Sequence, residues 1–204
     1  MKNMLKEAAI LFAITVIAGA ILGFIYDMTK EPIAEQNEKA KREACQEVFG
    51  DAQEFVNLDI SEEEAAVVLA ANGYDKASVN EAMEAKDASG TVLGYVMIIT
   101  SHDGYGGDIQ FSMGVRMDGT VNGISLLSIS ETPGLGMRAE EVLKPQFTEK
   151  HAAAFTYTKT GAVSEDQIDA ISGATITTNA VVSGVNAGLS YFQNGLEGGM
   201  RGEQ

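Results

Sequence analysis

Hydroxyl side chains gather in one short stretch near the C-terminal end of the chain, Asp169-Ala-Ile-Ser-Gly-Ala-Thr-Ile-Thr-Thr-Asn-Ala180. A serine and three threonines fall within seven residues, and the stretch contains a single acid. Apolar residues then recur at helical spacing, which predicts a helix over 176–193. A helix N-terminus presents unpaired N–H groups and the positive end of the helix dipole, and the two together bind phosphate. The chemistry that fits these residues is a threonine hydroxyl beside a phosphate, or esterified to one.

Two other interpretations of the stretch stay open. In the structural one, Thr175, Thr177 or Thr178 accepts hydrogen bonds from the free amides of the helix and acts as a cap. Capping needs one hydroxyl, however, and the stretch has four. A hydrolase that uses Ser172 as its nucleophile is a weaker alternative, because the sequence has no G-x-S-x-G motif and neither histidine has a recognisable triad setting.

The composition predicts a folded, acidic protein. The chain has 204 residues, of which 45% are hydrophobic and 21% are charged, so we expect one domain of ordinary size with attachments. The formal net charge of -15 argues against nucleic-acid binding. Cys45 is the only cysteine, which excludes an internal disulfide and a cysteine-only metal or iron–sulfur site in this chain. His102 and His151 are isolated in the sequence, and we expect neither to bind a metal.

The N-terminal region has the character of a membrane anchor. Residues 8–26, AAILFAITVIAGAILGFIY, carry no charge, and as a helix they would span roughly 28 Å, close to the hydrocarbon thickness of a bilayer. A cleaved signal peptide is the alternative, because Ala18-Gly19-Ala20 resembles a cleavage site, but the apolar run continues beyond it. We expect a transmembrane helix over 8–26 after an N-terminal cap over 1–7. Basic residues flank both ends, so charge does not fix the orientation.

The remaining elements predict an α+β fold. Residues 27–50 are rich in Ala, Glu, Lys and Arg and suit a helical stalk that ends at Gly50. Segment 51–77 is less distinct, but Ser61 before three glutamates predicts a short helix over 62–71. Four segments of strand character follow, and turn signals such as Asp118-Gly119 connect them into an antiparallel meander. The predicted strands cover about 79–86, 91–100, 108–117 and 120–129.

Two loops next to these strands are candidates for ligand contact. Loop 101–107, Ser-His-Asp-Gly-Tyr-Gly-Gly, has three glycines, which allow a backbone to approach a ligand closely. Pro133-Gly134 predicts a type II turn, and a short helix over 137–143 should end near Lys144-Pro145. We therefore expect an N-terminal transmembrane helix and stalk helix, then an antiparallel-sheet domain with flanking helices over 78–195 and a tail over 196–204.

The hydroxyl-rich stretch carries a resemblance to a known family. Asp169-Ala-Ile-Ser-Gly-Ala-Thr175 resembles the D-x-x-[ST]-G-A-T signature of the FMN-binding domain. This domain occurs in the G subunit of Rnf electron-transport complexes and in the C subunit of the sodium-pumping NADH:quinone reductase. Glu131-Thr-Pro-Gly-Leu-Gly136 and Gly104-Tyr-Gly-Gly107 are similar to two further stretches of these subunits. The resemblance extends over nearly the whole chain and is least over about 50–77.

The resemblance implies a covalent cofactor and a set of residues around it. Thr175 would be joined to FMN through a phosphoester, which a separate flavin transferase of the ApbE type makes from FAD. Thr132 or a backbone group is the expected hydrogen-bond partner of the flavin, and Leu135 the expected ring contact. Core packing of Leu135 remains open, as does a salt-bridging or capping role for Glu131. The other residues expected at the cofactor are Asp169, Ser172, Gly173, Ala174, Gly134, Gly136 and Tyr105.

The implied function is electron relay in a membrane complex. The family's Rnf complexes couple the redox chemistry of ferredoxin and NAD to sodium or proton translocation. The chain would be a single-pass protein of the cell (inner) membrane with its FMN domain on the extracytoplasmic side, and no catalysis is expected from it alone. Its expected partners are the other Rnf subunits, including membrane and iron–sulfur or flavin subunits, the flavin transferase and membrane lipid, but no nucleic acid.

Three alternatives to that function remain. The short chain favours the Rnf subunit over the C subunit of the quinone reductase. A stand-alone extracytoplasmic FMN electron carrier would use the same covalent cofactor. A non-redox anchored scaffold, in which the hydroxyl-rich turn is only a cap, would be colourless.

Overall fold

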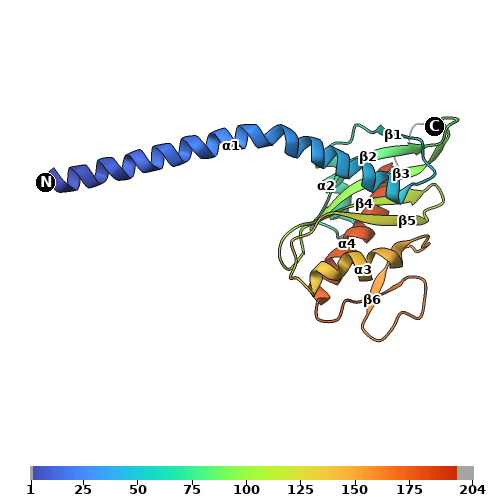
Figure 1. The fold of residues 1–204 in the computed structure, drawn as a ribbon. Coiled ribbons are helices and arrows are strands. Elements are labelled where there is room, and N and C mark those ends of the chain that lie inside the picture. Colours follow the sequence, from blue (N-terminus) through green and yellow to red (C-terminus); the bar gives the residue numbers. More distant parts are fainter. Residues whose placement is uncertain (1, 197–204) are drawn as a thin grey trace. The chain divides into compact units, whose positions relative to one another are not determined.

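The computed structural model describes residues 2–196 (Figure 1). It divides into two compact units, with the boundary between Ala40 and Lys41. Met1 of the predicted cap and residues 197–204 of the predicted tail lie outside the described residues. The first unit is helical and belongs to α1, which runs from Lys2 to Val48 with Pro32 inside it. Its most apolar window has a mean hydropathy of 2.6, and the helix is long and apolar enough to cross a membrane.

The second unit begins with the last turns of α1, which end two residues before the predicted stop at Gly50. A five-stranded antiparallel sheet follows, in the order β1-β2-β3-β4-β5. The strands are β1 Glu54–Asn57, β2 Ala77–Lys86, β3 Val92–Ser101, β4 Ile109–Arg116 and β5 Val121–Ser128. The four predicted strands are confirmed to within a few residues. β1 is an additional strand, so segment 51–77 contributes to the sheet as well as the predicted helix, α2 Glu62–Ala71.

Short elements connect the sheet to the last helix. They are the 3-10 turn η1 Gly136–Arg138, α3 Ala139–Val142, the 3-10 turn η2 Lys144–Phe147, and the parallel pair β6 Thr156–Thr158 and β7 Gln167–Asp169. The predicted stop near Lys144-Pro145 is confirmed, because α3 ends at Val142. Pro145 lies at the start of the separate turn η2, where its missing N–H costs no hydrogen bond. α4 Thr175–Tyr191 follows, and a π-helical turn, η3 Phe192–Leu196, extends it.

Both faces of the sheet are covered, which explains the continuous apolar run of β3. Tyr95, Met97 and Ile99 belong to the larger core, together with side chains of α2 and α4. Val96 and Ile98 alternate with them and pack in the second core. That core also contains Cys45 and Val48 of the last turns of α1, and Phe49, the residue that follows the helix. Because successive side chains point to opposite faces of a strand, a strand buried on both faces has no polar alternation.

Glycines on the sheet make room for the end of α1. A Cβ at Gly94 would lie 2.2 Å from the carbonyl oxygen of Val115 and 2.8 Å from Cζ of Phe49. A Cβ at Gly114 would lie 2.9 Å from the carbonyl oxygen of Val48. The Arg116 guanidinium lies 5.4 Å from the centre of the Phe49 ring on the same face. The end of α1 is therefore packed directly on the backbone of β3 and β4.

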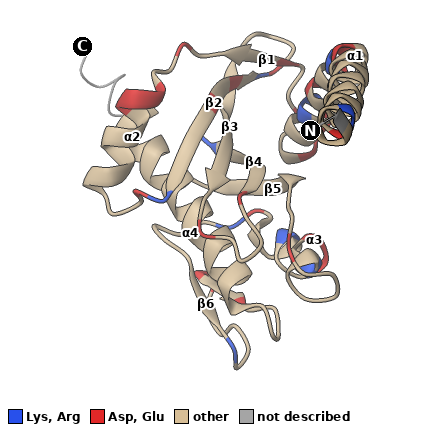
Figure 2. Ribbon diagram, turned by 90° about the vertical axis from the view of Figure 1, so that its left-hand side faces the viewer, with Lys and Arg blue, Asp and Glu red and all other residues tan. Residues whose placement is uncertain are grey.

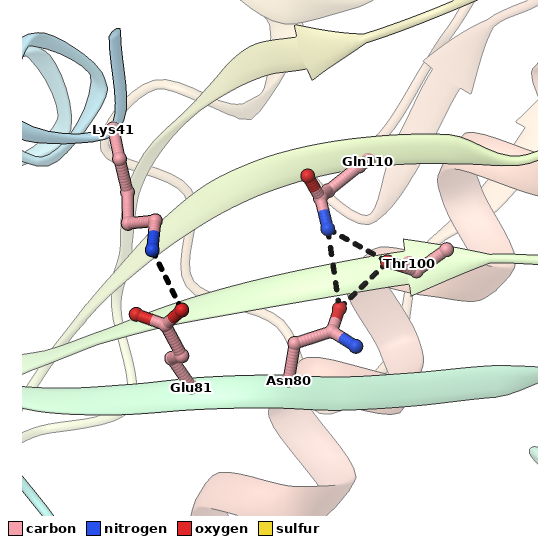
Figure 3. Close-up of polar contacts among 5 residues, drawn as sticks. All are labelled: Lys41, Asn80, Glu81, Thr100 and Gln110. Carbon is pink, nitrogen blue, oxygen red and sulfur yellow. Dashed lines mark hydrogen bonds and ion pairs between the residues drawn. The ribbon is translucent and has the colours of Figure 1, made fainter. Parts of the chain in front are cut away.

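Polar contacts also join α1 to this face. Ser112 donates a hydrogen bond to the carbonyl of Ala44 at 3.1 Å, and Glu47 pairs with Lys144 at 2.7 Å and accepts from Ser125. Lys41 pairs with Glu81 of β2 at 2.7 Å (Figure 3). A ladder of Asn80, Thr100 and Gln110 crosses the three neighbouring strands in the same view, with Thr100 donating to Asn80 at 2.6 Å. Charged residues also lie in the first turn of α2 and in α3 (Figure 2).

We predict that Gly94→Ala destabilises the second unit by about 1–3 kcal/mol, because the new methyl group collides with the β4 backbone at Val115 and with the buried Phe49 ring. Gly50→Ala is the matched control, since its Cβ would meet nothing closer than 3.8 Å. Denaturant unfolding of the full chain in detergent measures both changes. Equal stabilities of the two variants would contradict the close approach of β4 and Phe49 to Gly94.

We predict that the Glu47 contact weakens in acid. Burial raises the pKa of Glu47, but hydrogen bonds from Lys144 and Ser125 outweigh it and hold the pKa below its ordinary value of 4.5. A group with a lowered folded-state pKa stabilises the fold above its unfolded pKa and loses that contribution as the pH falls through the folded one. Glu47→Gln should therefore lower the melting temperature at pH 7, and the difference from wild type should shrink below about pH 4.5. The exposed Glu165→Gln is the control, and a pH-independent difference would refute the assignment.

Candidate functional site

A cavity of about 510 Å³ lies where the turn after β5 meets the N-terminus of α4. Its volume is typical of a site for a cofactor-sized molecule. Three segments far apart in the sequence contribute to its wall: the loop after β3, the turn at 131–136 and the residues that begin α4. The lining residues are Tyr105, Glu131, Thr132, Leu135, Gly136, Gly173, Ala174, Thr175, Ile176 and Thr177.

Two tight turns contribute to this wall. The first is the predicted type II turn, in which the Leu135 amide donates to the carbonyl of Thr132 at 3.1 Å and Gly134 has a φ of 76°. In the second, the Ala174 amide donates to the carbonyl of Ile171 at 3.0 Å and Gly173 has a φ of 80°. A Cβ at Gly173 would lie 3.1 Å from Cδ2 of Leu135, so the two turns are in contact.

The hydroxyl of Thr178 fixes the second turn. It accepts a hydrogen bond from the Ile171 amide at 3.1 Å and donates one to the carbonyl of Ala174 at 2.9 Å. Ala174 is the N-cap of α4, and no side chain makes a capping hydrogen bond there. The interpretation of the stretch as a threonine cap is therefore wrong. Thr175, the first residue of α4, is partly exposed and lines the cavity.

Glu131 is the buried acid of the cavity wall, with 6% of its surface exposed. Its Oε1 accepts hydrogen bonds from the amides of Tyr105 at 2.7 Å and Gly106 at 3.3 Å, which joins the loop after β3 to the turn at 131–136. Its Oε2 is buried and has no hydrogen-bond partner within residues 2–196. A Cβ at Gly136 would lie 2.8 Å from Oε2 and 2.6 Å from the Thr177 hydroxyl, so these three residues meet closely.

Apolar side chains at the cavity remain open to solvent. Tyr105 is 69% exposed, Ile176 is 52% exposed and Leu135 is 41% exposed. Core packing of Leu135, one of the alternatives that the sequence left open, is therefore wrong. Large apolar groups that are exposed around a cavity indicate a binding surface for a flat apolar ligand or for a partner.

Three of the expected site residues do not line the cavity. Gly134 shapes its turn, and Ser172 is an exposed residue of the other. Asp169 ends β7, where its carboxylate accepts from the Ala162 amide at 2.6 Å and its backbone pairs with the Gln146 side chain. Sequence reasoning missed Ile176 as a lining residue because it fitted the apolar stripe of the helix, and it assigned Thr177 only as a possible cap.

Metal binding finds no support in the described part of the chain. No group of three or more histidine, cysteine or acidic side chains could hold an ion there. His102 pairs with Asp108 at 3.1 Å, and His151 lies 3.3 Å from the Thr120 hydroxyl. Both histidines therefore have ordinary surface partners.

Two family models match the chain. The RnfG N-terminal region matches residues 1–48, and the FMN-binding domain matches residues 104–190, a range that contains every residue lining the cavity. Among solved structures, NqrC of Shewanella oneidensis covers 72% of this chain and 84% of its own, with a TM-score of 0.49 and 19% identity.

Relatives from several organisms align over almost the full length. The G subunit of the Na(+)-translocating ferredoxin:NAD(+) oxidoreductase complex of Acetobacterium woodii is 33% identical, over 95% of this chain and 93% of its own. The G subunit of the ion-translocating oxidoreductase complex of Methanosarcina acetivorans is 30% identical, over 93% and 95%. The G subunit of the proton-translocating ferredoxin:NAD(+) oxidoreductase complex of Clostridium ljungdahlii is 29% identical, over 88% and 90%.

We predict that Thr178→Val lowers the free energy of unfolding by about 1–3 kcal/mol, because the change leaves the Ile171 amide without its acceptor. Thr178→Ser keeps the hydroxyl and is the matched control. Chemical denaturation monitored by circular dichroism compares the two variants. A valine variant as stable as the serine variant would show that the Thr178 hydroxyl does not fix the turn.

Proposed function

Because the chain belongs to the family of G subunits of Rnf-type ion-translocating oxidoreductase complexes, we propose that it is the membrane-anchored flavoprotein subunit of such a complex. In this role it relays electrons through FMN joined to Thr175. Ferredoxin and NAD would be the redox partners of the whole complex, with sodium or protons as the transported ion. The observation that carries the proposal is the cavity beside Thr175, within the range that matches the FMN-binding domain.

The residues around the cavity fit a flavin nucleotide. The N-terminus of α4 supplies unpaired amides and a positive dipole end for a phosphate, and the Thr175 hydroxyl lies at the same place. Tyr105, Leu135 and Ile176 offer exposed apolar surface to a flat ring. The buried Oε2 of Glu131 still lacks a donor among the described residues, as expected for a group that a ligand satisfies.

Bound FMN would supply one- and two-electron transfer. The chain's own residues attach the cofactor, orient it and shield it. Glu131 fixes the loop that carries Tyr105, and the contact between Gly173 and Leu135 keeps the two turns together. Preorganised contacts of this kind would hold the cofactor in one position. The electron donor and the electron acceptor would therefore approach a flavin that does not move between the two transfers.

Attachment would require a separate flavin transferase of the ApbE type with FAD as the donor. The Thr175 Oγ would form a bond to the phosphorus next to riboflavin as the pyrophosphate P–O bond of FAD breaks and AMP leaves, and the hydroxyl proton would go to solvent. A phosphoester keeps the flavin on the protein when the domain faces the outside of the cell, where a dissociated cofactor would be lost.

The apolar residues 8–26 of α1 would anchor the chain in the cell membrane by a single pass. We propose that the domain lies on the extracytoplasmic side and that lipid surrounds this helix. The other subunits of the complex, including its membrane and iron–sulfur or flavin subunits, would be the immediate partners. This chain offers no metal cluster within its described residues, so the other redox centres of the relay would belong to those partners.

We predict that Thr175→Ala abolishes covalent flavin. The full chain is co-expressed with an active flavin transferase, and intact mass and in-gel flavin fluorescence are measured. The wild type should gain the mass of one FMN less one water, the alanine variant should gain nothing, and Thr175→Ser should keep the adduct because it retains a hydroxyl. An adduct on the alanine variant would place the flavin elsewhere, and no adduct on the wild type would refute the covalent cofactor.

A further inference from the structure

We propose that Glu131 contacts the cofactor directly. Its Oε2 would accept a hydrogen bond from a donor group of the bound flavin nucleotide, while its Oε1 positions the Tyr105–Gly106 backbone as one wall of the site. This inference rests on the proposed function. One carboxylate would then position a wall of the cavity and also supply the hydrogen-bond acceptor that faces the flavin.

The two oxygens of the Glu131 carboxylate have unequal surroundings. Oε1 accepts from two backbone amides, whereas Oε2 is buried without a partner among the residues that the structure describes. A buried acceptor that has lost its water and gained no donor is unfavourable, and buried polar atoms in folded proteins are nearly always paired. Since Glu131 lines the cavity, a ligand in the cavity is the natural source of the donor.

Close packing also fixes the carboxylate in place. A Cβ at Gly104 would lie 3.0 Å from Oε1, and a Cβ at Gly136 would lie 2.8 Å from Oε2. Glycine at both positions lets the backbone approach the acid on two sides. Oε1 is also tied to two amides, so Oε2 cannot turn to a new partner without breaking those bonds.

The donor belongs to one of two parts of the nucleotide. FMN carries an N–H on its ring system and O–H groups on its ribityl chain, and a carboxylate oxygen accepts from either. A negative carboxylate near the ring also opposes the addition of electrons to it, because added electron density is repelled by the charge. A ring contact therefore predicts a lower reduction potential than a neutral residue would give, whereas a ribityl contact acts mainly on binding and attachment.

The test is Glu131→Gln, which replaces one acceptor oxygen of the carboxylate with an NH₂ donor. The amide oxygen of glutamine can still accept from Tyr105 and Gly106, and this orientation places its NH₂ group where Oε2 was. The glutamine NH₂ group and the donor group of the flavin then face each other, and no hydrogen bond forms between them. Glu141→Gln is the matched control, because the Glu141 side chain is 79% exposed on α3 and lines no part of the cavity.

Both variants and the wild type are produced as full chains with a flavin transferase. The measurements are FMN occupancy by intact mass, the visible absorption spectrum and the midpoint potential. A ring contact predicts a shifted spectrum and a raised midpoint potential in Glu131→Gln. For a two-electron couple, a tenfold change in the ratio of the affinities for reduced and oxidised flavin corresponds to about 30 mV. A ribityl contact predicts an unchanged spectrum and several-fold lower occupancy.

Either of those results supports the contact, and the Glu141 control should match the wild type in all three measurements. A Glu131→Gln protein with wild-type occupancy, spectrum and potential would overturn it. Thermal unfolding of both variants on the Thr175→Ala background, without covalent flavin, shows whether the substituted glutamine still positions the loop, so a folding defect is recognised as such. If the wild type itself takes up no FMN, the proposed function fails rather than this inference.

Discussion

The close packing of α4 on the sheet is the constraint on which the site depends. A Cβ at Gly188 would lie 2.4 Å from Cδ1 of Ile99, and a Cβ at Gly184 would lie 2.9 Å from the Phe111 ring. With glycine at both positions the helix lies directly on β3 and β4, and its axis is fixed by the core (Figure 1). The position of its first turn then follows, because a helix is rigid over this length. Thr175 is placed by contacts made further along the helix.

The rest of the site is built around that first turn. The turn at 131–136 meets it through Leu135 and Gly136, and Glu131 connects this turn to the loop after β3. Each connection uses a glycine or a hydrogen bond to the Glu131 carboxylate, so the wall is preorganised in this structure. The exposed side chains of Tyr105, Leu135 and Ile176 lie at the cavity, where a cofactor or a redox partner would cover them.

Local patterns in the sequence predicted the elements whose cause is local. Asp118-Gly119 marks the hairpin between β4 and β5, Ser61 accepts from the Glu64 amide as the N-cap of α2, and Pro133-Gly134 forms its turn. β1, β6 and β7 have only three or four residues each, and their pairing depends on partners elsewhere in the chain. Such short segments carry too little periodicity to be distinguished from loops.

The difference between features set by neighbouring residues and features set by distant ones also applies to the site. The signature around Thr175 and the turn at 131–136 could be read from consecutive residues, and both line the cavity. The role of Glu131 could not, because the amides that it binds are 25 and 26 positions away in the sequence. Asp169 belongs to the signature by position, yet its carboxylate binds the Ala162 amide, since β7 ends before the turn into α4.

The most direct test of the proposed flavin site is an experimental structure of the chain after loading with FMN by a flavin transferase. We predict the phosphate on Thr175 at the N-terminus of α4, the ring among Tyr105, Leu135 and Ile176, and no large movement of the two turns. Flavin density on another residue, or a ring that lies outside the cavity, would contradict the claim that these turns form the flavin site.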